Sequence, residues 1–232
     1  MDRLIDIIKE FTPSEIIKIE EKDRQFKALK RLNAKIEDKT LFLKLIVINA
    51  LLSYQLQTKG EKYWENFSLH FSETPYIEAF YPFLKKYNKR LFSRKIERFQ
   101  KSLHCLRRWR GDYYCKNLTL FVKEMARCMG QKEDAKTIVF SAKMLLYGCR
   151  IVLKENILAP QGIFIPLDNR IKKISNRKEF WKKVEEETGI PLLHIDSILW
   201  VTMGIDEREI EEFPLPLREK LKKLKEFLYA II

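Results

Sequence analysis

Glycine and proline, the residues that most often interrupt regular structure, are scarce in this chain of 232 residues, with 7 and 8 copies respectively. Between these few interruptions, apolar residues recur with the 3.6-residue period of α-helices. We find no internal repeat and no linker-like segment. The sequence therefore predicts an all-α fold.

Long apolar runs and targeting signals are also lacking. The most apolar stretch, 41–56, contains Lys44 and Asn49 and is too short and too mixed to span a bilayer, so we interpret it as a buried helix. The N-terminal MDRLIDIIKEF is amphipathic and carries acidic residues, unlike a secretory signal or a transit peptide. We expect a cytoplasmic protein with no membrane contact.

Metal-binding motifs are missing too. The cysteines form no C-x-x-C pair, and the 3 histidines do not complete a zinc pattern. The 4 cysteines are Cys105, Cys115, Cys128 and Cys149. We expect free thiols in a reducing compartment, and no metal centre.

Acidic residues are outnumbered: 45 Lys and Arg stand against 32 Asp and Glu, a formal net charge of +13. The excess is spread along the chain in short groups, KKYNKR, SRKIER, LRRWR, NRIKK and REKLKKLK. Such a surface resists self-association and attracts polyanions. We expect a monomer, and charge alone leaves nucleic-acid binding and a merely basic surface as equal alternatives.

The helical pattern has recognisable starts. Thr12 is followed by Pro13 and Glu15, a capping box with proline in the first turn, and Asp206 with Glu209 and Asn176 with Glu179 repeat the spacing. We predict helices over 2–10, 13–35, 40–57, 61–71, 74–87, 93–106, 117–129, 134–153, 168–174, 177–188, 192–203, 207–212 and 216–230. The stretch 154–168, with two prolines and a glycine, is predicted to be a long functional loop.

The segment 127–140, RCMGQKEDAKTIVF, predicts a helix, a hairpin and a second helix. Gly130 suits the left-handed turn that ends a helix, and Asp134 suits the cap of the next helix. A helix N-terminus offers unpaired N–H groups to a phosphate, and Lys136 lies in that first turn. A lysine amine there is a candidate nucleophile that forms a Schiff base with a sugar carbon.

The helix that begins after this hairpin also carries a stripe of basic and aromatic side chains. Lys136, Phe140 and Lys143 are spaced i, i+4 and i+7, so they share one side of an otherwise apolar helix. Either this side faces water, or it faces a cleft in which the amines are used. Further along, Asp168 precedes a predicted helix and is expected to cap it, which still leaves one oxygen for a cleft.

Taken in order, several stretches resemble the archaeal 8-oxoguanine DNA glycosylases, the AGOG branch of the helix–hairpin–helix DNA glycosylase superfamily. The matching stretches are RQFKAL (24–29), INALLSYQLQTKGEKYWENF (48–67), DAKTIVFSAKM (134–144), IFIPLDNRI (163–171) and ETGIPLLHIDSILW (187–200). In 72–116 only length and helicity agree. The resemblance implies one helical glycosylase domain over 1–232, with the helix–hairpin–helix near 117–153 and two helical subdomains flanking a cleft.

The resemblance also implies roles for particular residues. Lys136 would be the Schiff-base nucleophile, and Asp168 the carboxylate that stabilises the positive charge developing on the sugar. Phe140 and Trp200 would sandwich a flipped base. The polar contacts to that base would come from Gln25, Lys143 and Asp196, and Trp64 would be a further contact in the base pocket.

The implied activity is a DNA repair glycosylase with an associated β-elimination lyase, acting near the chromosome on DNA that contains 8-oxoguanine and needing no metal or organic cofactor. The hairpin GQKEDA departs from the glycine-rich form of the wider superfamily. The alternatives are a non-catalytic binder of damaged or structured nucleic acid, a glycosylase for another lesion, and a basic helical scaffold for an acidic protein. Isolated residues favour blander interpretations: Gln25 and Lys143 would ordinarily face solvent, and Trp64 and Trp200 would ordinarily fill a core.

Overall fold

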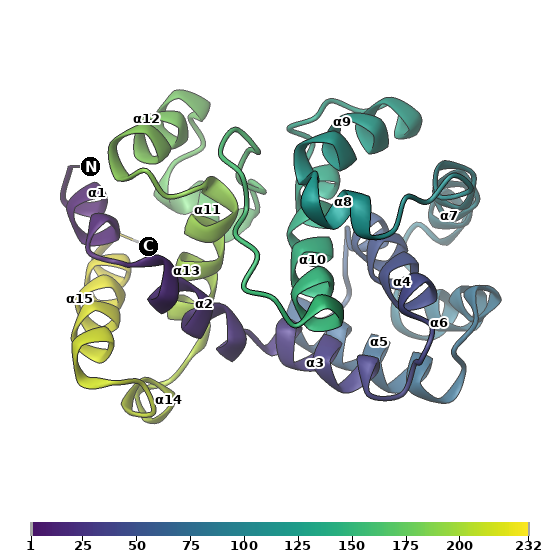
Figure 1. Cartoon of the computed structure of the whole chain (residues 1–232), viewed down its shortest axis with the longest axis horizontal. Helices are drawn as coiled ribbons and strands as arrows, with labels where there is room; N and C mark the ends of the chain where they lie inside the picture. Colours follow the sequence, from purple (N-terminus) through teal and green to yellow (C-terminus); the bar gives the residue numbers. More distant parts are fainter. Residues whose placement is uncertain (1, 232) are drawn as a thin grey trace. The chain divides into compact units, whose positions relative to one another are not determined.

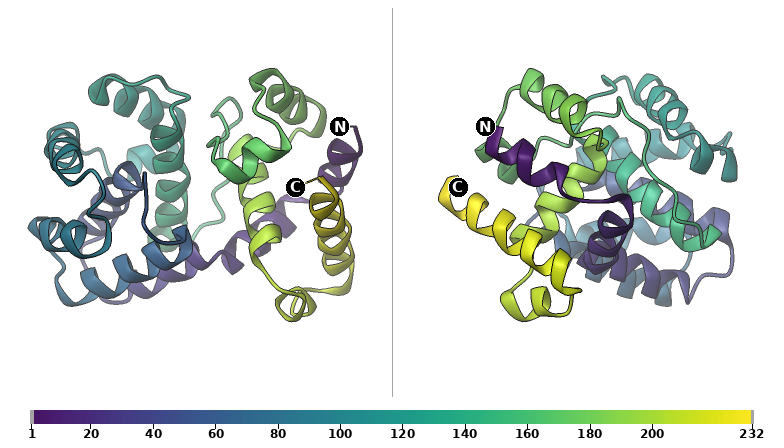
Figure 2. Two further views of the ribbon diagram at one scale, coloured as in Figure 1. Left: turned by 180° about the vertical axis from the view of Figure 1, so that it is seen from behind. Right: turned by 60° about the vertical axis from the view of Figure 1, so that its left-hand side comes forward.

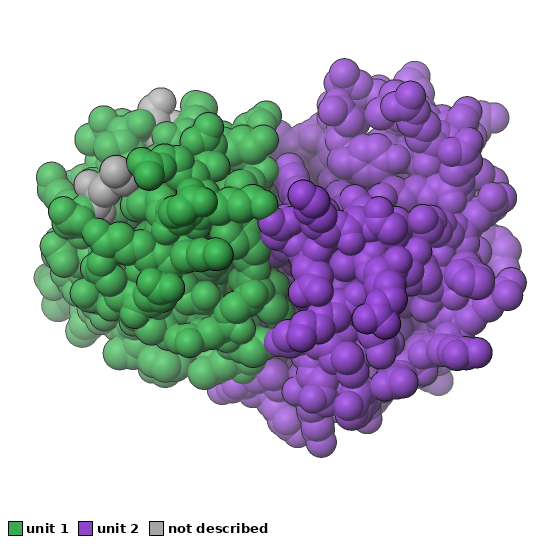
Figure 3. All heavy atoms as spheres, turned by 90° about the horizontal axis from the view of Figure 1, so that it is seen from above, with its two compact units in different colours: residues 1–23, 158–232 green, residues 24–157 purple. Residues whose placement is uncertain are grey.

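Helices make up most of the chain over residues 2–231, the range that the structure, a computed structural model, describes (Figure 1). This range contains no β-strand, which confirms the all-α prediction. Two compact units divide the chain. Unit 1 comprises residues 1–23 and 158–232, and unit 2 comprises residues 24–157 (Figure 3).

Unit 1 holds both ends of the chain. Its helices are α1 (Asp2–Lys9), α2 (Pro13–Lys22), α11 (Asn169–Ile174), α12 (Lys178–Thr188), α13 (Leu192–Gly204), α14 (Glu207–Glu211) and α15 (Leu215–Ile231). α13 packs against α2 and α15, and α1 packs against α12 and α15. Apolar side chains such as Leu4, Trp181 and Leu221 fill the core between them. α13 therefore has neighbours on several sides, and its residues 192–199 are all buried.

Unit 2 is built on two helices that run side by side. Its helices are α3 (Arg24–Asn33), α4 (Lys39–Leu52), α5 (Gly60–Glu73), the short 3-10 helix η1 (Ile77–Ala79), α6 (Phe80–Tyr87), α7 (Phe92–Cys105), α8 (Asp112–Lys116), α9 (Leu118–Met129) and α10 (Lys136–Leu153). α10 packs along α4, α3 packs against α5 and α10, and α9 lies against α7 and α10 (Figures 1 and 2). A Cβ atom at Gly148 of α10 would lie 2.8 Å from side-chain atoms of Leu43 and Ile46 on α4, so a larger residue would force these side chains to shift.

Capping and turn residues in the sequence predicted most helix boundaries, and the boundaries that were predicted wrongly have specific causes. The capping boxes at Thr12 and Asp206 are confirmed, whereas α12 begins after Arg177 rather than after Asn176. The predicted helix 13–35 is broken at Asp23, a buried residue whose ψ of 126° is extended. No glycine or proline marks that break. The short helix α8 was not predicted.

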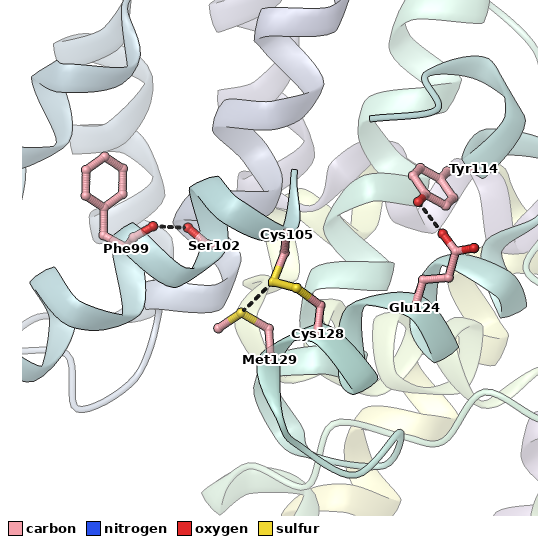
Figure 4. The surroundings of a disulfide bond; sticks show 7 residues. All are labelled: Phe99, Ser102, Cys105, Tyr114, Glu124, Cys128 and Met129. Atoms are coloured by element: carbon pink, nitrogen blue, oxygen red, sulfur yellow. Dashed lines mark hydrogen bonds between the residues drawn. A yellow bond between two sulfur atoms is a disulfide. The ribbon is translucent and has the colours of Figure 1, made fainter. Parts of the chain in front are cut away.

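The expectation of free thiols is wrong. Cys105 on α7 is bonded to Cys128 on α9, and Cys115 on α8 is bonded to Cys149 on α10, with Cα–Cα distances of 5.7 and 5.5 Å (Figure 4 shows the first pair). Sequence separations of 23 and 34 residues match no disulfide signature. The pairing follows from helix packing, which brings the sulfur atoms within bonding reach.

Residues 2–231 contain neither a candidate membrane-spanning helix nor a candidate metal site. None of the helices in this range is long and apolar enough to cross a membrane. In the same range, no group of three or more His, Cys, Asp and Glu side chains is gathered as a metal site would require.

Candidate active site

The helix–hairpin–helix forms where the sequence predicts it. α9 ends at Met129, and Gly130 takes the left-handed conformation with φ 63°, so this prediction is confirmed. The N–H of Gln131 donates to the carbonyl of Ala126 at 2.9 Å, which closes the helix end. The prediction that Asp134 caps the next helix is wrong, because Ala135 occupies the cap position and makes no side-chain bond. The first turn of α10 thus keeps N–H groups suited to an anion.

Arg98 on α7 forms hydrogen bonds with residues on both sides of this hairpin. Its guanidinium donates to the side-chain oxygen of Gln131 at 2.6 Å and to the hydroxyl of Thr137 at 2.7 Å. A third bond, from Nε to the carbonyl of Leu51 at 2.8 Å, ties the same group to the end of α4. Burial lowers the pKa of Arg98, yet a guanidinium keeps its charge in proteins. No local pattern indicated this residue, because its partners lie 33, 39 and 47 residues away.

The stripe on α10 runs from solvent into the interior of unit 2. Lys136 is exposed at the first position of the helix, Phe140 is half-buried one turn later, and Lys143 is only 1% exposed. The Nζ of Lys143 lies 5.7 Å from the ring centre of Tyr147. The interpretation that the whole stripe faces water is therefore wrong, and the two lysines have different surroundings suited to different roles.

Aromatic and polar side chains from three helices of unit 2 gather near this stripe. The rings of Trp64 on α5 and Phe140 on α10 meet edge to face at 6.0 Å. Gln25 is 3% exposed on α3, a helix that packs against both α5 and α10. The expectation that Gln25 and Lys143 face solvent is thus wrong for both. The indole N–H of Trp64 is buried and has no hydrogen-bond partner within residues 2–231, so an acceptor on a bound molecule would satisfy it.

Asp168 caps α11 in unit 1, as predicted. Its Oδ1 accepts hydrogen bonds from the N–H groups of Arg170 and Ile171, both at 2.9 Å. Since both capping bonds use Oδ1, the cap leaves the second carboxylate oxygen for other chemistry. The side chain is half-buried, and a carboxylate held by two backbone donors has a fixed direction.

Asp196 and Trp200 lie one turn apart on α13, against which α11 packs. Asp196 is 3% exposed, and Trp200 is half-buried. The guanidinium carbon of Arg170 lies 3.8 Å from the ring centre of Trp200 and covers one face of the indole. Arg170 is absent from the predicted site residues, because its only local sign is its position two residues after Asp168.

The predicted loop between Lys154 and Asp168 contains no helix. In unit 1 its main chain is held by a buried histidine: the N–H of Ala159 donates to Nε2 of His194 at 2.9 Å. Because Nε2 accepts, Nδ1 carries the proton and donates to Glu20 at 2.9 Å. This chain of bonds joins the loop to α13 and α2.

Comparisons with known proteins find similar chains over most of this sequence. The AGOG family profile, described as N-glycosylase/DNA lyase, matches residues 5–229. An N-glycosylase/DNA lyase of Thermococcus kodakarensis is 39% identical, over 97% of this chain and 89% of the relative, and one of Nanoarchaeum equitans is 38% identical, over 98% of both. The crystal structure of an 8-oxoguanine DNA glycosylase from Pyrobaculum aerophilum in complex with 8-oxoguanosine has a TM-score of 0.77 and 24% identity, over 96% of this chain and 95% of that one.

Proposed function

Because the chain belongs to the AGOG family of N-glycosylase/DNA lyases, we propose that its substrate is 8-oxoguanine in DNA, which it excises before cutting the strand. The observation that carries this proposal is the gradient along α10, with Lys136 exposed at the helix start and Lys143 buried two turns on. The exposed amine supports a role in contacting a nucleotide at the surface, and the buried amine supports a role in contacting the flipped base.

Lys136 is the proposed nucleophile. Its neutral amine attacks C1′ of the damaged nucleotide, the glycosidic bond breaks, and the base leaves with a proton. Opening of the sugar ring gives a Schiff base between Nζ and C1′. Loss of a proton from C2′ then expels the 3′ phosphate, which cleaves the strand on that side of the lesion. The hydrogen bonds from Arg98 to Gln131 and Thr137 support this role by holding both sides of the hairpin that presents Lys136.

Asp168 is proposed to stabilise the positive charge that develops on the sugar as the base departs. The α11 cap supports this role, because it fixes the carboxylate by way of Oδ1 alone. The second carboxylate oxygen, which the cap does not use, suits the proton transfers that follow attack on C1′. No step in this scheme calls for a metal or an organic cofactor.

The flipped base is proposed to stack on Phe140 and Trp200, at about 1–3 kcal/mol per stacked base. Arg170 supports the role of Trp200, since it covers one face of the indole and fixes the ring. Trp64 and Lys143 are proposed to donate to acceptors on the base, and the buried indole N–H of Trp64 is suited to that contact. Asp196 is proposed to accept from N1–H and the exocyclic amine, which every guanine edge offers.

Gln25 is proposed to read the lesion itself. 8-Oxoguanine carries an N7–H donor, whereas N7 of guanine is an acceptor, and an amide oxygen pairs only with the donor. Gln25 is 3% exposed, so guanine at this place would set two acceptors against each other in a buried site, at a cost of about 1–3 kcal/mol. The lesion would thus be recognised by a hydrogen bond rather than by shape.

We also propose that both units belong to one glycosylase domain that acts as a monomer, since the matched residues 5–229 include parts of each. The competing possibilities are a glycosylase for another lesion and a family member that binds damaged or structured nucleic acid without chemistry. A panel of modified bases separates the first from our proposal, and covalent trapping separates the second.

The deciding experiment is borohydride trapping on a duplex that contains one 8-oxoguanine. Wild type and Lys132→Gln, which removes another exposed hairpin lysine, should both form a covalent protein–DNA band, and Lys136→Gln should form none. A band in Lys136→Gln would move the nucleophile elsewhere, with Lys143→Gln as the next variant to test. No band from wild type, with tight binding retained, would refute the Schiff-base mechanism on this lesion.

A further inference from the structure

A pocket of about 310 Å³ lies on unit 2, and none of the residues assigned above to base excision lines it. It is bounded by the end of α7, the segment 106–111, α8 and α9. Part of its lining is apolar, and two of these residues, Phe121 and Met125, are buried. The Cys105–Cys128 disulfide forms part of its wall (Figure 4). Because the disulfide links α7 to α9, it fixes two sides of the pocket.

Positive charge surrounds this apolar surface. Arg108, Arg110 and Arg127 line the pocket together with one carboxylate, Glu124, so the lining carries three positive charges and one negative charge. Arg110 lies 3.8 Å from Glu124, which also accepts a hydrogen bond from Tyr114. Arg108 and Arg127 are exposed and form no salt bridge within residues 2–231. Two guanidinium groups are therefore available to an anion.

The pocket adjoins the hairpin. Arg127 and Cys128 lie in the last turn of α9, directly before Gly130. On α7, Lys101 lies one turn before Cys105, and its Nζ is 3.3 Å from the position that a Cβ of Gly130 would occupy. The basic residues of α7 and α9 thus continue from the pocket to a hairpin that contains a single glycine. Basic side chains of α7 and α9, among them Lys101 and Arg127, therefore lie next to the hairpin.

We propose that this pocket binds a backbone phosphate of the DNA duplex outside the lesion site, through Arg108 and Arg127. Guanidinium groups hold phosphate oxygens with paired N–H donors, and the apolar part of the lining accommodates the neighbouring deoxyribose. The contact carries no sequence information and fixes the register of the duplex on unit 2. It adds an anchoring site to the proposed base excision.

The test measures binding of an undamaged duplex to the full-length protein over a range of salt concentrations. Arg108→Gln/Arg127→Gln should lower the slope of log affinity against log salt by about 0.9 for each phosphate that the protein no longer neutralises, and the affinity at 0.1 M salt about tenfold for each. The matched control, Arg31→Gln/Arg208→Gln, removes two exposed arginines outside the pocket. Equal slopes for the two double variants would overturn the proposal.

Glu124→Gln is a second variant, for which the proposal predicts stronger DNA binding instead of weaker binding. It removes the only carboxylate among the lining residues and releases Arg110 from its ion pair, so DNA binding should strengthen severalfold and its salt dependence should steepen. Misfolding does not strengthen binding, and unchanged or weaker binding would count against the pocket. This assay uses undamaged DNA and reports binding alone, whereas borohydride trapping reports chemistry on the lesion, so failure of either proposal is distinguishable from failure of the other.

Discussion

The guanidinium of Arg98 lies 2.7 Å from the hydroxyl oxygen of Thr137, the residue that directly follows the proposed nucleophile Lys136. The same guanidinium reaches Gln131 on the other side of the hairpin. One side chain of α7 therefore determines how the hairpin closes and where α10 begins. A residue that touches no substrate in the proposed mechanism would still control the direction of its nucleophile.

We predict that Arg98→Lys slows base release in single-turnover assays by at least tenfold while leaving DNA affinity close to that of wild type. Lysine keeps the charge but has no planar fork to bridge Gln131 and Thr137. Arg98→Ala should in addition lower the free energy of unfolding by about 3 kcal/mol, because its partly buried partners lose charged donors. Thr137→Val, which removes one of these bonds, is the milder control. Wild-type rates in Arg98→Lys would show that the hydrogen bonds of Arg98 to Gln131 and Thr137 have only a structural role.

The two disulfides are expected to contribute strongly to stability. With sequence separations of 23 and 34 residues, loop entropy predicts about 3–4 kcal/mol for each. Cys128→Ser and Cys149→Ser should lower the free energy of unfolding in urea by such amounts, and added reductant should have no further effect on the double variant. Cys105 and Cys128 are half-buried whereas Cys115 and Cys149 are buried, so reductant should open the first bond earlier. Identical urea midpoints with and without reductant in wild type would contradict this.

Lys95 gives stability a specific pH dependence. Its buried amine donates to the main-chain and side-chain oxygens of Asn88 and lies 5.1 Å from the ring centre of Tyr54. Burial, with a smaller contribution from the charge of Arg90, lowers the pKa of Lys95 to about 8, whereas the unfolded chain keeps the ordinary value of 10.5. Between pH 8 and 10 the unfolded state therefore binds more protons, and the free energy of unfolding should rise with pH.

The size of this rise should approach about 2 kcal/mol over that window, at 1.36 kcal/mol for each unit of pKa difference. Urea denaturation at several pH values, wild type beside Lys95→Met, isolates it, because other lysines and tyrosines titrate in both proteins. The stability difference between the two should move in favour of wild type as pH rises from 8 to 10. A constant difference would show that Lys95 is protonated throughout.

How much of the site was predictable depends on the range of the interactions involved. Gly130 and the Asp168 cap were predictable because their conformations depend on residues within one turn. The i, i+4, i+7 spacing placed Lys136, Phe140 and Lys143 on one side of a helix, but it did not show that this side passes from solvent into the interior. That gradient depends on α3, α4 and α5, which come earlier in the chain.

Features that depend on tertiary packing were missed or wrong. Arg98 and the cysteine pairs join segments 23 to 47 residues apart, and nothing in the local sequence distinguishes them from surface arginines or free thiols. Asp134 has the right residue type for a cap, yet α10 begins two residues later, after Ala135. The roles of Gln25 and Asp196 came from the family resemblance. Burial of both side chains agrees with those roles, which await measurement.

The proposed contact between Gln25 and N7–H of 8-oxoguanine predicts how a Gln25 variant changes the binding preference for this base over guanine. In a Lys136→Gln background, which binds without turnover, Gln25→Ala should reduce the preference for 8-oxoguanine over guanine at the same position of a duplex by roughly 5- to 150-fold. This range corresponds to the about 1–3 kcal/mol cost of an unsatisfied buried acceptor. Asp196→Asn is the matched control, because the guanine edge that it contacts is common to both bases, so affinity should fall for both and the ratio should hold. Urea denaturation separates this effect from loss of stability. An unchanged ratio in Gln25→Ala would show that the lesion is distinguished elsewhere, with the indole N–H of Trp64 as the next donor to test against the C8 carbonyl.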